Sequence, residues 1–360
     1  MKKKERDYVK IKTMYLFLLK CIFIVTFLCN ISSVFANNIQ ISSQELVEQD
    51  MFNSYYIMVK FDITMDNSWR VSSAPNNYDG VWIFVKYKRI SDGKWYHATL
   101  NALSENHYTG SQASNATIQV ANNGKGVMFY RSSDGTGNFS SSNVKLRWEY
   151  GLDNIGNFLP AEISEVKIYG IEMVYVPEGA FYVGSGGSES NHFYSYGGNE
   201  AYQISSENEI IVEQNNGNLW ATGEIETSII PLAFPKGFSS FWCMKYEITQ
   251  EQYVDFLNTL TRSQQNTRTA TDINGTIITN RYVMSNTPNL LYRNGIRCNT
   301  ALPSAPEPVT FYCDLNANGI YNELDDGQNI ACNFLSWADC AAYSDWAGLK
   351  PMTELEFEKA

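Results

Sequence analysis

The chain has 360 residues, of which 27 are Lys or Arg and 38 are Asp or Glu, so its formal net charge is −11. This length predicts two domains, and a hydrophobic fraction of 44% excludes wholesale disorder. The excess of acid also excludes a nucleic-acid binder, which needs a basic surface to replace the counterions on phosphates.

The first 36 residues predict a signal peptide. A basic start is followed by a nearly continuous apolar stretch from Met14 to Cys29, and Val34 and Ala36 occupy the −3 and −1 positions of a cleavage site. A membrane anchor is the alternative, but Lys20 leaves no run near the ~18 apolar residues that a span needs. We therefore expect export to the periplasm, the cell surface or the medium, with no stable transmembrane span after cleavage.

Cleavage after residue 36 changes both the charge and the cysteine count. It removes seven basic and two acidic residues and leaves 20 basic and 36 acidic ones, a formal charge of −16. An oxidising compartment permits disulfides, but five cysteines cannot all pair within one chain. The five that remain are Cys243, Cys298, Cys313, Cys332 and Cys340.

Residues 37–172 read as an all-β domain. Apolar and charged residues alternate strictly over 144–150, which predicts a strand with one buried face. The continuous run 81–85 predicts a strand covered on both faces. Asp-Gly and Asn-Gly turns separate these runs from others, and about seven short strands predict a β-sandwich. The other runs are 55–63, 95–100, 116–120, 127–130 and 166–169.

Several aromatic and histidine side chains in this region have two interpretations each. His97 and His107 have no third ligand nearby, so solvated histidines are favoured over a metal site. The aromatic residues form either a platform on which a sugar stacks or a set of core and rim residues, and we favour the second. These aromatics are Trp69, Tyr78, Trp95 and Tyr96.

The second predicted domain begins at Met173. The segment 173–185 has an apolar run on each side of a Pro-Glu-Gly turn, which predicts a β-hairpin. A stretch rich in Gly, Ser and Asn follows over 186–218 and predicts a polar surface insertion. His192 lies in this stretch without other metal-ligating residues.

Capping boxes predict where three helices begin. In this motif an N-cap hydroxyl and an acidic or amide side chain three residues later bond to each other's backbone amides. A predicted strand over 241–248 precedes the first helix, and Gly348 is expected to end the second. The pairs are Thr249 with Gln252, Ser336 with Asp339, and Thr353 with Glu356.

Three segments in this part resemble the formylglycine-generating enzyme, or sulfatase-modifying factor, family. They are Met-Val-x-Val-Pro-x-Gly-x-Phe-x-x-Gly-Ser from Met173, Lys-Tyr-Glu-Ile-Thr-Gln-Glu-Gln-Tyr-x-x-Phe from Lys245, and Leu-Ser-Trp-Ala-Asp-x-x-x-Tyr-x-x-Trp-Ala-Gly-Leu-Lys-Pro-Met-Thr-Glu-Leu-Glu-Phe-Glu from Leu335. The resemblance covers about half of the chain. It implies an α+β fold related to C-type lectins over residues 173–360.

The resemblance also implies copper-dependent oxidation of a protein cysteine to formylglycine by O₂. In the family, a pair of cysteines in the C-terminal half of the domain holds Cu(I), a soft metal that prefers thiolates. We expect this chain to end before that half, so that 173–360 is the N-terminal part of the domain and the copper site lies outside it. Catalytic and cofactor-binding residues therefore stay unassigned, and Cys243 and Cys340 are expected to be structural thiols.

A candidate calcium loop lies near the end of the chain. Its spacing matches an EF-hand-like loop, with Gly319 at the sixth position for the sharp turn, although Asn replaces Asp twice and the last ligand is Asp. An Asn/Gly turn without an ion is the alternative. Cys313 and Cys332 bracket the loop and predict a disulfide. The candidate ligands are Asp314, Asn316, Asn318, the carbonyl of Ile320, Asn322 and Asp325.

Two functions follow from these observations. The first is an exported enzyme of the formylglycine-generating class that acts on a protein or peptide substrate. The alternative is a non-catalytic relative that serves as a cell-envelope or surface protein, in which the β-sandwich recruits a partner or a glycan. The iron-dependent sulfoxide synthase branch of the superfamily is disfavoured, because its N-terminal module is helical and His-rich whereas this chain has only three histidines.

Overall fold

The computed structural model of the chain describes residues 38–111, 115–153, 162–185, 190–198, 200–223 and 226–360. The predicted signal peptide lies outside these residues. Strands predominate over helices in the described part of the chain, in agreement with the predicted β-rich class. None of the described helices has the length and apolar character needed to cross a membrane.

The N-terminal half is a sandwich of two antiparallel layers. In the first layer β2 (Tyr56–Arg70) pairs with β1 (Gln40–Asp50) and β7 (Gly135–Trp148). In the second, β3 (Tyr78–Arg89) pairs along one edge with β8 (Ile163–Val176) and along the other with β6 (Val127–Arg131) and β4 (Trp95–His97). The layer continues outward from β6 to β5 (Ala116–Val120) and from β8 to β15 (Phe241–Met244).

Strand β3 is buried on both faces, as its continuous apolar run predicts. Val81, Ile83 and Val85 point into the core between the two layers. Trp82 and Phe84 point the other way, into a second core that includes helical residues. Because side chains alternate along a strand, Lys86 lies on the same face as Trp82 and Phe84.

The helices begin at the predicted capping boxes. These elements are α2 (Gln250–Leu257), α4 (Trp337–Ala347) and α5 (Glu354–Lys359), and each has both hydrogen bonds of the box. Gly348 ends α4 in the left-handed conformation, as expected. A fourth box, formed by Thr261 and Gln264, begins α3 (Arg262–Asn266) and was not predicted.

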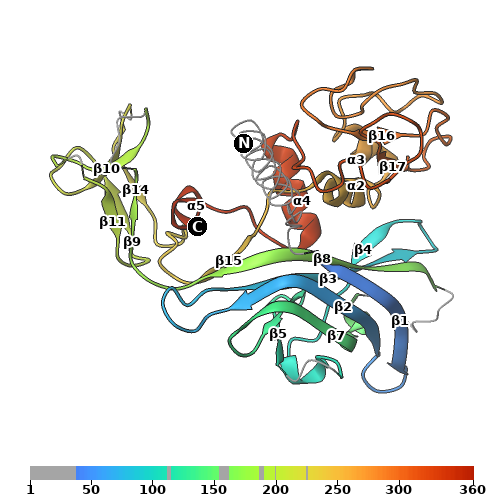
Figure 1. Ribbon diagram of the computed structural model, residues 1–360, viewed down its shortest axis with the longest axis horizontal. Coiled ribbons are helices and arrows are strands. Elements are labelled where there is room, and N and C mark those ends of the chain that lie inside the picture. Colours follow the sequence, from blue (N-terminus) through green and yellow to red (C-terminus); the bar gives the residue numbers. More distant parts are fainter. Residues whose placement is uncertain (1–37, 112–114, 154–161, 186–189, 199, 224–225) are drawn as a thin grey trace, which may run out of the picture. The chain divides into compact units, whose positions relative to one another are not determined.

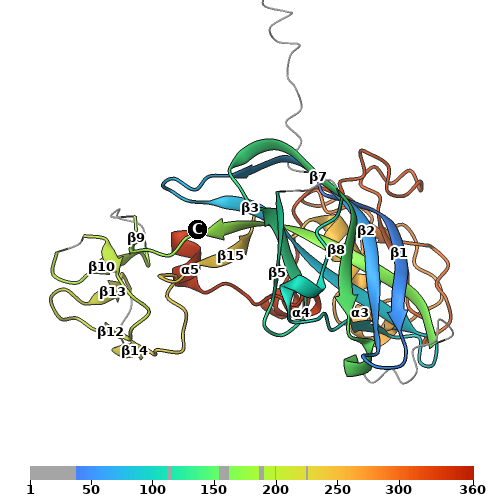
Figure 2. The ribbon, with the colours of Figure 1, turned by 90° about the horizontal axis from the view of Figure 1, so that it is seen from below.

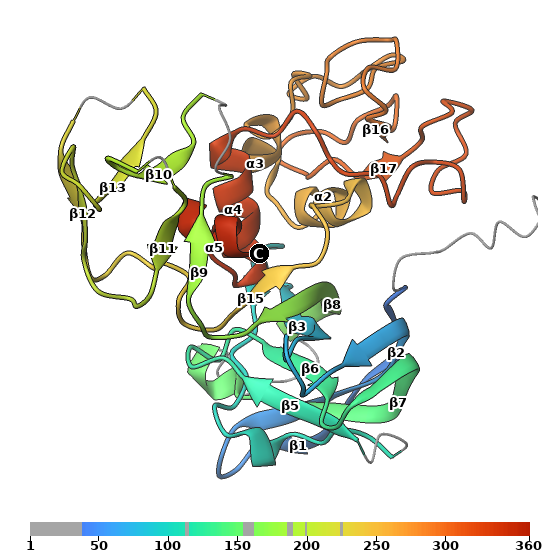
Figure 3. The ribbon, with the colours of Figure 1, turned by 60° about the vertical axis from the view of Figure 1, so that its left-hand side comes forward.

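The helical part packs on the outer face of the second sandwich layer. Helices α2 and α4 lie on one side of β3 and β8, and the first layer lies on the other (Figure 1; Figure 3). Trp346 of α4 contacts Phe84 and Tyr169, with ring centroids 5.1 and 4.9 Å apart. Trp82 Nε1 donates a 2.7 Å hydrogen bond to the carbonyl of Ala347. Residues 39–360 accordingly form one structural unit.

The predicted hairpin over 173–185 is wrong. Its first half is the end of β8, which pairs with β3 on one edge and with β15 on the other. Both edges of β8 are therefore occupied where the hairpin partner would bind. The second half, β9 (Phe181–Val183), pairs instead with β11 (Tyr202–Ile204). The predicted domain boundary at residue 173 lies inside β8.

The region predicted as a polar insertion contains short strands. These are β10 (Phe193–Ser195), β11 and β12 (Ile210–Val212). Two further strands, β13 (Leu219–Ala221) and β14 (Ser228–Ile230), follow the region, and the sheet order is β10-β13-β12-β14 (Figure 2). A small core of Val183, Ile204, Ile210 and Leu219 includes Leu355 of α5. Scattered apolar residues in a Gly- and Asn-rich stretch thus suffice for local packing.

Loops make up most of the chain between α3 and α4. They contain one antiparallel pair, β16 (Ile296–Cys298) with β17 (Phe311–Cys313). Phe311 and Val309 are buried against α2 in the second core, so these loops are anchored despite their irregular backbone. The candidate calcium loop begins directly after β17.

Candidate functional site

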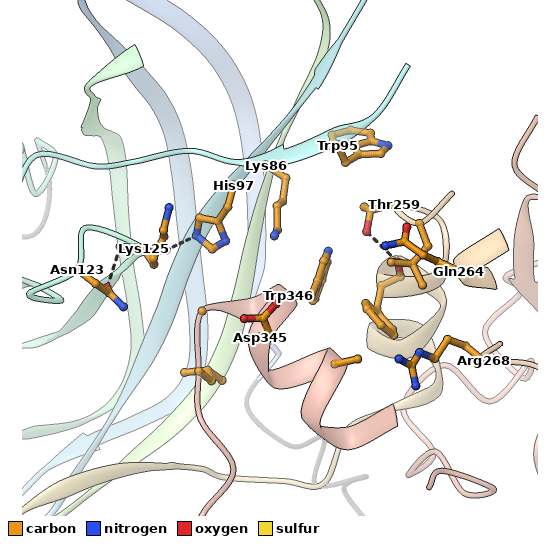
Figure 4. A pocket seen from close by; sticks show the side chains of 15 residues that line it. Lys86, Trp95, His97, Asn123, Lys125, Thr259, Gln264, Arg268, Asp345 and Trp346 are labelled. Carbon is orange, nitrogen blue, oxygen red and sulfur yellow. Dashed lines mark hydrogen bonds between the residues drawn. The ribbon is translucent and has the colours of Figure 1, made fainter. Parts of the chain in front are cut away.

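A cleft of about 620 Å³ lies where the sandwich meets the helical part. Strands β3 and β4 supply Lys86, Trp95 and His97 to its wall, and α4 supplies Asp345 and Trp346 (Figure 4). Segments far apart in the sequence therefore build one hollow. We call it the junction cleft. Its other lining residues include Asn123, Lys125, Thr259, Gln264, Arg268 and Gly348.

Lys86 is the least expected residue of the junction cleft. Its side chain is only 6% exposed, and Figure 4 shows it between the rings of His97 and Trp346. Among the described residues none hydrogen-bonds to its ammonium group, and no carboxylate lies within 4.0 Å of it. Burial lowers the pKa of Lys86 to about 7, and the more distant Asp345 opposes this shift.

The other two cations of the cleft have polar partners. Arg268 Nη1 lies 3.0 Å from the Asp339 Oδ1 atom, an acid that belongs to the capping box of α4. Lys125 Nζ donates a 3.4 Å hydrogen bond to Thr99 Oγ1. Lys86 thus differs from both in having no polar partner among the described residues, and of the three cations only Arg268 is paired with a carboxylate.

His97 is a neutral ring in this wall. Burial and, to a lesser extent, the charge of Lys86 lower its pKa to about 3. Its Nε2 atom hydrogen-bonds to the backbone carbonyl of Lys125. Because a carbonyl oxygen only accepts, Nε2 carries the proton in this bond. The histidine therefore orients the wall and adds no positive charge near Lys86.

Helix α4 approaches the sandwich through Gly348. A Cβ atom at this position would lie 3.1 Å from Lys125 Cβ and 3.2 Å from His97 Cε1. The residue also has a φ of +71°, which glycine adopts without steric cost. This glycine therefore both ends the helix and permits the close contact that forms one end of the cleft.

Trp346 contributes a second unsatisfied group. Its indole Nε1 is buried and has no hydrogen-bond partner among the described residues. Its ring is fixed by Phe84, Tyr169 and Phe256, whose ring centroids lie 4.9 to 5.7 Å away. An N–H donor and an ammonium group thus both lack acceptors at this wall.

A second hollow, of about 710 Å³, lies within the sandwich, and its charged lining residues are paired with each other. Its charged lining residues are Arg147 and Glu149, which form an ion pair of 2.7 Å. Asn101 Nδ2 donates to the same carboxylate. Because these groups satisfy each other, we do not assign this hollow a ligand.

The four aromatic residues considered as a sugar platform do not share one surface. Tyr78 begins β3 and stacks on Tyr175 at 4.5 Å, whereas Trp95 pairs with Lys88 at the other end of that strand. Ten residues of strand separate these ends by roughly 33 Å. Tyr96 stacks on Tyr87 on the sandwich side, and Lys245 lies over Trp69. Trp95 alone of the four lines the junction cleft.

The candidate calcium loop places some predicted ligands together and uses others to hold its own shape. Asn316 Nδ2 lies 3.4 Å from Asp325 Oδ2, while the oxygens of Asn316 and Asn318 accept the amides of Asn318 and Ile320. Asn322 Oδ1 accepts the amide of Cys313 at 3.1 Å and so closes the base of the loop.

Two buried carboxylates lie at the centre of this loop. Asp314 and Asp326 are both 0% exposed. In the part of the chain that the structure describes, no donor is within full hydrogen-bond geometry of either oxygen of Asp314 or of Asp326 Oδ1. Arg297 Nε lies 3.3 Å from Asp314 Oδ2, and the backbone amides of Ala317 and Gly319 also lie near the Asp314 carboxylate. Burial raises the pKa of Asp314, and Arg297 opposes this shift. Asp326 also lies within 4.8 Å of the acids Glu323 and Asp325, measured between carboxylate oxygens.

The described cysteines are protonated thiols, of which Cys298 and Cys313 are buried and the other three are half-buried. Burial raises the pKa of all five, to about 12 for Cys313 and Cys332 and about 11 for Cys298. The predicted disulfide between Cys313 and Cys332 is wrong, because both are free. Cys332 Sγ instead contacts Asn294 Nδ2 at 3.8 Å and the carbonyl of Asn333 at 3.7 Å.

The sequence alone contained little that would have predicted the junction cleft. Lys86 carried one usable signal, since it interrupts the apolar face that Trp82 and Phe84 begin on the same strand. Nothing in the sequence linked it to Trp346, 260 positions later. Asp326 directly follows the last predicted calcium ligand and was missed because the loop template ends at Asp325.

Comparison with known proteins identified no relative: no family model, no curated protein and no solved structure matches this chain.

Proposed function

We propose that the protein is an exported binding protein of the cell envelope or cell surface that carries a formylglycine-generating-enzyme-like domain. Its ligand binds in the junction cleft, between the β-sandwich and helices α2 and α4. The observation that carries this proposal is Lys86, a buried residue in the wall of a 620 Å³ cleft, whose ammonium group has no acceptor among the described residues. The leader sequence and the resemblance of residues 173–360 support the export and the domain assignment.

A purely structural role does not account for Lys86. Burial of an unpaired charge is costly, and an apolar residue of similar size at this position would pack better against Phe84 and Trp346. Both rings lie near its ammonium group, with centroids 6.0 and 5.5 Å away. A bound ligand that accepts from the ammonium group removes this cost. Lys86 thus fits a binding residue better than a core residue.

The copper chemistry that the resemblance implies does not fit the described cysteines. Cu(I) binding requires thiolates, and burial favours the neutral thiol at all five positions. In the described residues the one compact set of metal-ligating side chains, Glu323, Asp325 and Asp326, contains no cysteine. We therefore assign no oxidation step to these residues, and the binding function proposed here rests on the junction cleft.

We also propose that the loop after β17 binds calcium. Asp314 and Asp326 are buried with unpartnered oxygens, and Asp325, Glu323 and Asn316 lie beside them. Carboxylate and amide oxygens are the ligands that calcium takes. When bound, the ion supplies positive charge to this group of acids, whose negative charges outnumber the single positive charge of Arg297. In this arrangement Asp326 joins the predicted ligands, and Asn322 closes the loop.

The calcium proposal predicts a metal-dependent stability. Millimolar calcium is expected to raise the melting temperature of the wild-type protein, and Asp326→Asn is expected to abolish most of this rise. Asp272→Asn, at an exposed turn that is not part of the loop, serves as the matched control. Equal calcium responses of Asp326→Asn and the wild type would show that the loop is an Asn/Gly turn without an ion.

A ligand panel tests the binding function. Neutral oligosaccharides, acidic oligosaccharides and peptides are added separately, and the melting temperature is measured for the wild type, Trp95→Ala and Trp69→Ala. At least one class is expected to stabilise the wild type and Trp69→Ala but not Trp95→Ala, because Trp95 lines the cleft and Trp69 does not. Copper-dependent formation of an aldehyde on a cysteine peptide would contradict the proposal and favour the oxidase.

A further inference from the structure

We propose that the ligand of the junction cleft is an acidic sugar whose carboxylate binds Lys86. This inference rests on the proposed binding function and specifies the chemistry of the same site. A hexuronic acid combines the three features that the cleft accommodates: one negative charge, a ring of moderate size and several hydroxyl groups. Each feature corresponds to particular residues of the wall.

The charge of the ligand follows from the balance of groups in the cleft. Arg268 and Lys125 already have partners, in Asp339 and Thr99 respectively. Thr99 is neutral, so among the described residues no carboxylate pairs with either Lys86 or Lys125, while Asp345 brings one negative charge to the same wall. Two such cations beside one carboxylate suit a monoanion. A phosphate dianion would leave an excess of negative charge in the cleft, because Lys86 and Lys125 together carry two positive charges and Asp345 already offsets one of them.

The remaining lining residues fit a hydroxyl-bearing ring. Trp95 lines the cleft between Lys86 and Gln264, and an indole face stacks on the apolar side of a sugar. The amide oxygens of Asn123 and Gln264 accept from Lys125 and Thr261, and their NH₂ groups are donors that can pair with hydroxyl groups. Both are exposed and so reach the mouth of the hollow. A few polar groups around an aromatic surface are typical of small-molecule sites.

The position of Lys86 gives the binding a defined pH dependence. Its pKa is about 7, whereas sugar carboxylates are ionised throughout the range above pH 5. The other titratable groups that face it are His97 from β4, which is neutral above pH 4, Lys125 from the turn before β6, and Asp345 from α4. Attraction of the carboxylate therefore weakens as the pH rises from 6 to 9 and Lys86 loses its proton.

Calorimetric titration with defined trisaccharides tests the inference. The probes are the trimer of galacturonic acid and the neutral trimer of galactose, added to the purified protein at pH 6 in EDTA, so that calcium bound by the acidic sugar does not contribute. The acidic trimer is expected to bind at least tenfold more tightly than the neutral one. Lys86→Gln is expected to remove this preference, and Lys60→Gln, a change at a partly exposed ion pair of β2, is expected to retain it.

The outcomes separate this inference from the function on which it rests. Equal affinity for both trimers, with loss of both in Trp95→Ala, would overturn the acidic-sugar inference and leave the binding function intact. Binding of neither trimer would overturn the inference as well, and peptide stabilisation in the ligand panel would then still support the function. Tight binding of the acidic trimer by Lys86→Gln would show that another group holds the carboxylate.

Discussion

At the scale of single residues, Lys86 links stability to function in this protein. The residue is buried, and its ammonium group lies beside Phe84, His97 and Trp346 with no acceptor in the described part of the chain. Residues that bind ligands are often retained at a cost to the stability of the free protein. The same residue should therefore be replaceable with a gain in stability and a loss of binding.

Lys86→Met is predicted to stabilise the ligand-free protein by ~1–3 kcal/mol at pH 6, because an apolar side chain of similar length removes the buried charge. The folded-state pKa of about 7 lies below the ordinary value of 10.5. The wild type therefore carries the full cost below pH 7 and loses it as the pH rises toward 10.5. Urea unfolding at pH 6 and pH 9 measures the gain, which should shrink at pH 9.

The contrary result for Lys86→Met is a loss of stability that is the same at both pH values. That outcome would mean that the lysine stem packs in a way no apolar side chain reproduces, and it would remove the energetic argument for a ligand. Lys60→Met, at a partly exposed ion pair, is the control and is expected to change stability by less than ~1 kcal/mol.

At the scale of elements, the starts of helices can be predicted from local sequence, whereas the pairing of strands cannot. The capping boxes at Thr249, Ser336 and Thr353 each begin a helix as expected, because side-chain and backbone atoms within one turn decide them. The hairpin over 173–185 fails because β8 pairs with β3 and β15, which lie far away in the sequence. Strand pairing is a non-local property that a turn motif alone does not determine.

Substitution of Gly348 tests whether the close approach of α4 to the sandwich contributes to stability. Gly348→Ala is predicted to destabilise the protein by ~2 kcal/mol or more, because the new Cβ meets Lys125 and His97 and the backbone is left-handed. Gly93→Ala is the matched control, since Gly93 has a similar φ of +66° but no atom within 4 Å of its Cβ position. Thermal unfolding of both variants measures the difference.

If the two glycine variants lose the same stability, backbone strain accounts for the whole effect. The close contact between α4 and the sandwich would then contribute nothing measurable. A larger loss in Gly348→Ala, together with weaker ligand binding, would confirm that this contact shapes the cleft.

At the scale of the whole molecule, the outer face of β3 joins the sandwich to the helical part. The sequence predicts that this strand is covered on both sides, since its run 81–85 is apolar throughout, but it does not show what covers it. The covering residues come from α2 and α4, more than 160 positions later. The junction cleft was unpredictable for the same reason, whereas the calcium loop is one contiguous segment with a recognisable spacing.

This shared core predicts a single unfolding transition. Phe84→Ala is expected to destabilise the sandwich and the helical part together, by about 3–5 kcal/mol, because Phe84 contacts Tyr169 of β8 and Trp346 of α4. Circular dichroism of the strands and near-ultraviolet signals of the tryptophans should follow one curve in urea. Two separate transitions would show that the halves fold independently and that the cleft joins two domains with little shared stability.

The central claim is that the junction cleft is the functional site, and hydrogen exchange with bound ligand tests it most directly. Saturation with the galacturonic acid trimer is predicted to slow amide exchange in β3 and β4 near Lys86 and His97 and at the end of α4 near Trp346 and Gly348. Protection confined to the short strands β9 to β14, or to the hollow around Arg147 and Glu149, would contradict the account.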